Sequence, residues 1–209
     1  MPKNTYFNLQ ENKRNLILEV SIDEFSRQGY ENASISNIVK NAGIAKGSFY
    51  QYFEDKKDLF KYIIEVASIK KVSYLGESQI KASSLDFFEL LRVLYRVALQ
   101  FLRENPKLAL ISDDFAKNTD REFKEEILGV GIEKSNEFLK ELLQKGIYKG
   151  EINSNIDIDF IAYMLTSLSI ALGDYCRNKF IDLYEMDEIH YYKLVDQTIE
   201  LVKQGIKID

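Results

Sequence analysis

The chain of 209 residues contains one cysteine, one histidine, two prolines and no tryptophan. The single cysteine, Cys176, excludes an intrachain disulfide and cannot hold a zinc ion by itself, which is typical of proteins from reducing compartments. The only histidine is His190, and with Asp187 three residues before it the sequence supplies at most half of a carboxylate–histidine motif for a di-iron site. We therefore expect no metal site and no cofactor.

Long apolar segments are also missing. No stretch approaches the about 18 consecutive apolar residues that a membrane helix needs, and residues 1–10 lack the apolar core of a secretory signal. The sequence contains neither a glycine-rich phosphate loop nor the glycine-flanked serine turn of a hydrolase. We expect a cytoplasmic protein that does not associate with a membrane and is not an enzyme.

Hydrophobic residues make up 45% of the chain, which is enough to bury a sizeable core. There are only two prolines and ten glycines to interrupt helices. Leu, Ile, Glu and Lys dominate where strands would need alternating Val and Thr. The sequence therefore predicts an all-α fold.

Charge is distributed unevenly along the chain. The net charge is −5, but residues 1–57 hold eight Lys and Arg against seven Asp and Glu, so this part carries +1 and the remainder −6. Positive charge attracts the phosphate backbone of nucleic acids, although its placement matters more than its sum. The asymmetry gives weak support to a nucleic-acid role for the N-terminal part.

The N-terminal part shows the spacing of three short helices. Apolar residues predict a helix over about 9–28, and Gly29 suits the left-handed conformation that ends a helix. A second helix is expected to begin at Ser34, whose hydroxyl can cap it, and to end before Gly43. A third must then begin near Ala45. Two helices joined by such a tight, glycine-containing turn form a helix-turn-helix unit.

The third helix is expected to have two different faces. Phe49 and Phe53 lie four residues apart and face the core, whereas Lys46, Gly47 and Tyr50 lie on the opposite face. A helix that enters the major groove by its N-terminus brings free N–H groups toward phosphates, and a glycine there lets the DNA backbone approach. The predicted DNA contacts are Lys46, Gly47, Ser48, the hydroxyls of Tyr50 and Tyr52, and Lys56 from the start of the next helix. The alternative is that Tyr50 and Tyr52 only pack the core.

Residues 29–60, GYENASISNIVKNAGIAKGSFYQYFEDKKDLF, resemble the DNA-binding domain of the TetR family of transcriptional regulators. The shared pattern consists of Gly29-Tyr30, Ser34, Ala42-Gly43-Ile44, Lys46-Gly47-Ser48, Tyr50, Tyr52-Phe53 and Lys56. The resemblance implies the same DNA contacts, adds Ser34 to them, and makes Lys46 the best candidate for reading bases. Three positions depart from the pattern: Asn37 replaces an acidic residue, Val39 a small alanine, and Ala45 the usual serine cap, at a cost of about 0.5–2 kcal/mol of helix stability.

We expect residues 1–56 to form the helix-turn-helix DNA-binding domain and residues 57–209 a larger helical domain. In the larger domain, Ser84 and Asp157 can each cap a helix, and Pro106 can begin one. The resemblance implies that this domain binds a small-molecule effector. It also implies that the last two long helices, about 158–178 and 188–204, pair with those of a second subunit.

Aromatic residues gather in the larger domain and can line an effector pocket, although core packing explains most of them. These residues are Phe87, Phe88, Tyr95, Phe101, Phe115, Phe123 and Tyr163. We predict a homodimeric repressor that binds a palindromic double-stranded DNA operator and is released by a small-molecule effector. Two alternatives remain: a helical protein-binding adaptor that reads no DNA, and a bundle that sequesters a ligand without regulating transcription.

Overall fold

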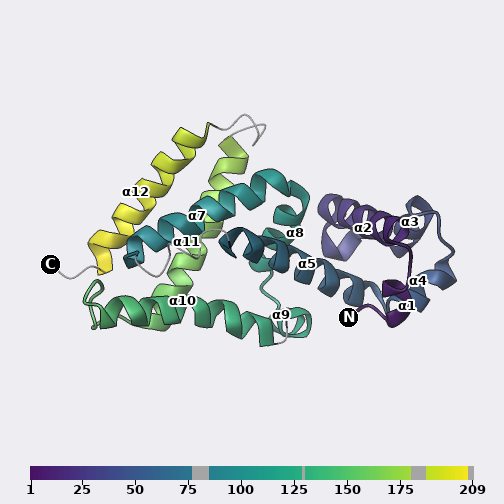
Figure 1. Cartoon of the computed structure of the whole chain (residues 1–209), viewed down its shortest axis with the longest axis horizontal. Coiled ribbons are helices and arrows are strands. Elements are labelled where there is room, and N and C mark those ends of the chain that lie inside the picture. The colour runs from purple at the N-terminus through teal and green to yellow at the C-terminus, as the bar shows by residue number, and fades with distance from the viewer. Residues whose placement is uncertain (77–84, 129, 180–186, 207–209) are drawn as a thin grey trace. The chain divides into compact units, whose positions relative to one another are not determined.

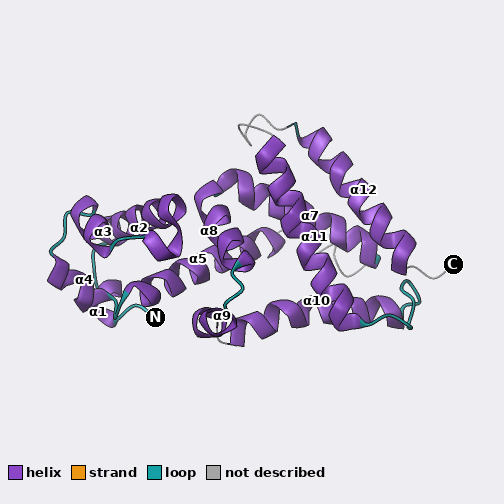
Figure 2. Ribbon diagram, turned by 180° about the vertical axis from the view of Figure 1, so that it is seen from behind, coloured by secondary structure: helices purple, strands orange, loops and turns teal. Residues whose placement is uncertain are grey.

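The computed structural model describes residues 1–76, 85–128, 130–179 and 187–206. Within these ranges every regular element is an α-helix, as the composition predicted (Figures 1 and 2). The helices are α1 (Asn4–Phe7), α2 (Glu11–Asn32), α3 (Ile35–Asn41), α4 (Lys46–Tyr52), α5 (Lys56–Gly76), α7 (Phe87–Glu104), α8 (Pro106–Lys117), α9 (Arg121–Leu128), α10 (Val130–Tyr148), α11 (Ile158–Lys179) and α12 (Glu188–Ile206). Pro106 begins α8, as predicted, and the proposed Ser84 cap lies outside the described residues.

The chain forms two compact units whose boundary differs from the predicted division at residue 56. The first unit comprises Met1–Lys70 and Asn105–Val130, and the second comprises Lys71–Glu104 and Gly131–Asp209. α5 begins at Lys56, where the predicted boundary lies, and continues without a break past Lys70, and α8 packs against α2. The first unit therefore contains two helices, α8 and α9, that the sequence analysis assigned to the larger domain.

Aromatic packing explains why α8 and α9 belong to the first unit. Phe60 of α5 has its ring centroid 5.1 Å from that of Phe25 in α2 and 6.0 Å from that of Phe115 in α8. Phe123 of α9 lies 6.1 Å from Phe60. Such aromatic clusters bury much apolar area for their size, so they hold these four helices in one core.

Two glycines at which helices were expected to end have the left-handed conformation, which the sequence predicted for Gly29. Gly29, with φ of 67°, interrupts α2 one turn before its end. Gly43, with φ of 62°, follows α3, where its N–H donates to the Lys40 carbonyl at 3.3 Å and the Ile44 N–H donates to the Val39 carbonyl at 3.0 Å. This pair of hydrogen bonds is the Schellman motif. It turns the chain directly into α4.

In the second unit, α7 and α12 pack against each other through buried side chains. Tyr191 of α12 donates from its hydroxyl to the Tyr95 carbonyl of α7 at 3.1 Å. Burial raises the pKa of Tyr95 to about 12, and burial likewise raises that of Tyr191. Both hydroxyls therefore remain neutral at physiological pH, and that of Tyr191 keeps the proton that it donates.

α11 begins as predicted, because Asp157 Oδ1 accepts from the Phe160 N–H at 3.0 Å. Cys176 on the same helix is fully buried and packs as a small hydrophobic residue. Within the described ranges, no helix has both the length and the apolarity needed to cross a bilayer.

The aromatic residues that were considered for an effector pocket are mostly core. Phe87, Phe88, Tyr95, Phe101 and Phe115 are each less than 9% exposed, and they divide between the two units. Tyr163 is different, because 68% of it is exposed. Core packing therefore accounts for these five residues, but it does not account for Tyr163.

Candidate nucleic-acid interface

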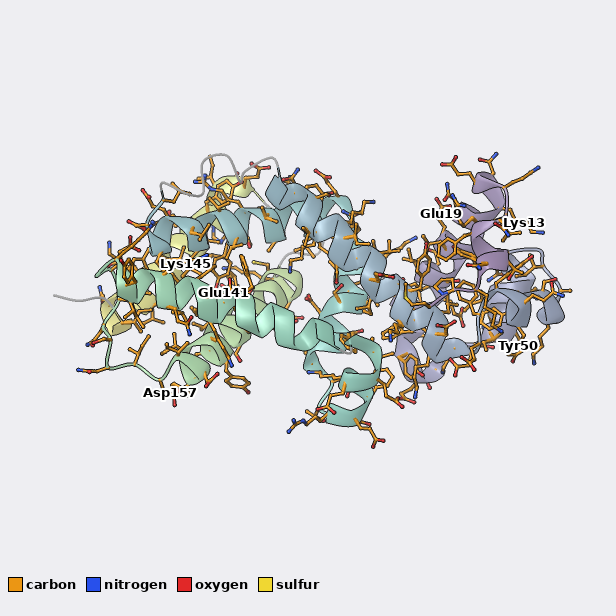
Figure 3. All side chains as sticks on the ribbon, turned by 60° about the horizontal axis from the view of Figure 1, so that its bottom comes forward. Lys13, Glu19, Tyr50, Glu141, Lys145 and Asp157 are labelled. Carbon is orange, nitrogen blue, oxygen red and sulfur yellow. The ribbon has the colours of Figure 1, made fainter. Side chains whose placement is uncertain are left out.

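α4 separates its buried and exposed side chains as the sequence predicted. Phe49 is fully buried and Tyr52 is 7% exposed, whereas Lys46 and Gly47 are exposed and Tyr50 is 44% exposed. Tyr50 lies at the outer edge of the first unit (Figure 3). The core-packing alternative therefore applies to the ring of Tyr52. The ring of Tyr50 also contacts that of Phe49, with centroids 5.3 Å apart, but it stays partly exposed.

The protein's own structure gives no reason for a glycine at position 47. A Cβ added to Gly47 would meet no atom within 4 Å, and its φ is not in the left-handed region. Glycine in a helix costs about 0.8–1.0 kcal/mol relative to alanine. A requirement outside the folded chain is the remaining physical explanation, and a closely approaching DNA backbone is such a requirement.

Ser34 stands at the start of α3, but the prediction that its hydroxyl caps the helix is wrong. The buried carboxylate of Glu24 in α2 provides the cap instead, because its Oε1 accepts from the Ser34 N–H at 3.0 Å. The same oxygen accepts from Asn37 Nδ2 at 3.1 Å. Asn37, which departs from the TetR pattern, therefore holds the carboxylate that caps α3.

Lys56 has a structural role that the predicted phosphate contact did not anticipate. Its Nζ donates to the carbonyls of Tyr30, Glu31 and Ala33 at 2.7, 2.9 and 3.3 Å, and it lies 4.8 Å from the centre of the Tyr30 ring. An ammonium group has three protons to donate. All three are used at the C-terminal end of α2, where a cation also suits the helix dipole.

The segment that precedes α2 has a structure that was not expected from the sequence. Residues Asn4–Phe7 form the short helix α1, which packs against α4. Tyr6 is fully buried in this segment. The adjacent aromatics Tyr6 and Phe7 were the available signal, because two large apolar rings in a polar segment seldom both face water.

The exposed face of α4 is therefore a short helix surface with one lysine, one glycine and two hydroxyl-bearing residues, Ser48 and Tyr50. These groups can donate hydrogen bonds to base edges and to phosphate oxygens. α3 and the Schellman turn present α4 as the second helix of a helix-turn-helix unit.

Comparisons with known proteins agree with this geometry. Residues 17–63 match the sequence model of the family described as bacterial regulatory proteins, tetR family. A solved TetR family transcriptional regulator from Chloroflexus aurantiacus is 32% identical, with a TM-score of 0.82 and 100% of both chains covered. The probable acrEF/envCD operon repressor of Escherichia coli K12 is 26% identical over 210 residues, which span 90% of this chain and 93% of the repressor.

A third similarity concerns the fold alone. The transcriptional regulator FadR from Bacillus subtilis, solved in complex with stearoyl-CoA, is 20% identical with a TM-score of 0.73, and the match covers 92% of this chain and 98% of FadR. The helix-turn-helix geometry, the sequence match and the full-length similarity lead to one conclusion. The chain belongs to the TetR family and is a DNA-binding transcriptional regulator.

Proposed function

We propose that this regulator binds a palindromic operator as a homodimer, acts as a repressor, and is released by a small amphipathic anion. The observation that carries the DNA-binding part is the exposed face of α4, whose Gly47 serves no internal purpose. Repression is supported by the similarity to an operon repressor over almost the whole chain.

We propose that the DNA contacts come from Ser34, Lys46, Gly47, Ser48 and Tyr50. Lys46 is the candidate for base recognition, because its exposed ammonium can reach either a base edge or a phosphate. Tyr52 contributes at most its hydroxyl, since its ring is buried. Lys56 supports the interface by holding the end of α2.

Selection of bound sites from random double-stranded DNA tests this proposal, and we expect a palindromic sequence to be enriched. The affinity for that site should then fall with rising salt, with log K changing by about −0.9 per log unit of salt for each phosphate contact. If no duplex is retained at low ionic strength, the proposed function is wrong. In that case the protein-binding adaptor is favoured.

The homodimer is supported by an apolar face on α11 that stays largely exposed among the described residues of the second unit. Phe160, Tyr163, Met164 and Tyr175 follow one another at helical spacing and are 56, 68, 38 and 46% exposed. Ser167 lies on the same face, but its hydroxyl donates to the Tyr163 carbonyl at 2.9 Å and presents no unpaired donor. A patch of this kind is typical of a surface that another protein covers.

α12 has a matching face. Leu201 is 67% exposed, and Leu194 and Thr198 lie at helical spacing before it. The hydroxyl of Thr198 donates to the Leu194 carbonyl at 2.9 Å, so this donor is already paired within α12. A second copy of the chain is the occupant that fits, because a palindrome is read by two identical units about 34 Å apart.

The effector site that we propose is a groove of about 750 Å³ in the second unit, between α7 and the start of α12. Val93, Val97 and Leu99 provide an apolar wall, and Arg96 and Arg103 provide positive charge. An apolar wall beside two guanidinium groups suits a ligand with an acyl chain and an anionic group. FadR, which shares the fold, was solved with such a ligand, stearoyl-CoA.

The ion pair between Arg103 and Glu188 gives this proposal a test. An anionic ligand must compete with Glu188 for Arg103, so Glu188→Gln is expected to strengthen stearoyl-CoA binding and Arg103→Met to weaken it, each about 2- to 5-fold. Isothermal titration measures both. Arg92→Met is the matched control, because Arg92 forms an ion pair with Asp196 at 2.9 Å between the same two helices but does not line the groove.

If all three variants bind stearoyl-CoA equally, this groove is not the anion site. The protein must have one conformation that binds the operator and another that does not. A ligand in the groove can release DNA only if it binds the first conformation less tightly than the second. The off-rate from the operator should therefore rise at saturating stearoyl-CoA. If operator DNA and stearoyl-CoA leave each other's affinity unchanged, the ligand-sequestering alternative is favoured.

A further inference from the structure

The helix that we assign to DNA recognition is too short to hold itself in place. α4 has seven residues, and neither end is capped by a side chain from its own flanks. The last carbonyls of any helix lack partners within the helix, and isolated helices of this length are unstable in water. The geometry of α4 must therefore be imposed by other segments.

The N-terminal segment supplies donors to the last carbonyls of α4. Lys3 Nζ donates to the Tyr50 carbonyl at 2.9 Å, and the Lys3 backbone N–H donates to the Tyr52 carbonyl at 2.8 Å. The hydroxyl of Thr5 donates to the carbonyl of Gln51, which lies between them. Three consecutive carbonyls of α4 are thus capped by a segment almost 50 residues away in sequence.

Tyr6 anchors this segment in the core of the first unit. Its ring is fully buried, 4.9 Å from the ring of Phe53 and 5.5 Å from that of Tyr62, measured between centroids. Its hydroxyl donates to the Arg14 carbonyl at 3.2 Å. Arg14 in turn donates from its guanidinium to the Phe7 carbonyl at 3.1 Å. These contacts tie the segment to α2 and α5 as well as to α4.

We propose that residues 3–7 are a clamp that positions the recognition helix, with Lys3 and Thr5 as its positioning residues and Tyr6 as its anchor. This inference depends on the proposed role of α4 in operator binding. The clamp holds α4 in its binding orientation before DNA arrives, so that less ordering is needed on binding. Lys3 then raises operator affinity by positioning α4 and not by contacting a DNA phosphate, despite its positive charge.

Substitution of Thr5 provides the sharpest test, because Thr5 is exposed and carries no charge. Thr5→Val has nearly the same shape but no hydroxyl, and it is expected to lower operator affinity about 3- to 10-fold, the effect of one lost hydrogen bond. Thr5→Ser keeps the hydroxyl and should bind like the unchanged protein. In the absence of DNA, hydrogen exchange at the α4 amides should be faster in the Val variant than in the Ser variant.

Lys3→Met distinguishes the clamp from a direct DNA contact. The clamp predicts weaker binding with an unchanged dependence of log K on log salt, whereas loss of a phosphate contact reduces that slope by about 0.9. A reduced slope, or equal exchange rates and equal affinities for the two Thr5 variants, would overturn the clamp. If the unchanged protein binds no DNA, the proposed function fails, but the exchange comparison still decides whether α4 is clamped.

Discussion

Replacing Tyr163 and Leu201 together by aspartate is expected to convert the protein into monomers and to reduce operator affinity by about 100-fold or more. Both side chains are more than 60% exposed in the single chain, so the substitutions should not disturb its own core. In the proposed dimer they would bury carboxylates without partners, which is strongly unfavourable. The operator affinity falls because a dimer with two linked recognition helices binds about 10²- to 10⁴-fold more tightly than a monomer with one.

Sedimentation analysis gives the oligomeric state, and titration of the selected operator gives the affinity. Tyr148→Asp is the matched control, because Tyr148 is 94% exposed in the same unit but lies on α10 and belongs to neither apolar face. A dimer that survives the double substitution would mean that α11 and α12 do not form the interface. A monomer with undiminished affinity would mean that dimerisation does not serve operator binding.

Gly47→Ala is expected to have opposite effects on stability and on DNA binding. The free energy of unfolding should rise by about 0.5–1 kcal/mol, because alanine is the better helix former and the added methyl group meets no atom of the protein. Operator binding should weaken by about 1–3 kcal/mol, the range of one lost DNA contact. Thermal unfolding and operator titration on the same sample measure the two effects.

Asn15→Ala in α2 provides the control for this prediction. Asn15 is also exposed on a helix of the first unit, so its replacement raises helix propensity without a change of charge. It should stabilise the fold and leave operator affinity unchanged. If Gly47→Ala binds the operator as tightly as the unchanged protein, DNA does not approach α4 at this position.

Features that depend on near neighbours in the sequence were predicted correctly. Gly29 and Gly43 were expected to end helices, and both have positive φ. The division of α4 into a buried face with Phe49 and an exposed face with Lys46 followed from helical spacing. Asp157 was expected to cap α11, and its carboxylate lies three residues from the N–H that it accepts.

Features that depend on distant segments were not predicted. Glu24 displaces Ser34 as the cap of α3 from ten residues away, and Lys56 binds carbonyls 23 to 26 residues before it. Lys3 counted only as positive charge in the sequence, yet it caps α4 from 47 residues away. A local pattern shows which side chains have donors and acceptors, but not which partners the folded chain brings within hydrogen-bonding distance.

The sequence by itself therefore determined the all-α fold, the helix-turn-helix unit and the candidate DNA-binding face, because helical periodicity and glycine conformation act over a few residues. The tertiary structure alone decided that α8 and α9 join the first unit, that Lys56 caps α2, and that the N-terminal segment holds α4. These outcomes arise from packing between segments far apart in the chain, where burial and hydrogen-bond satisfaction of the whole unit select the partners.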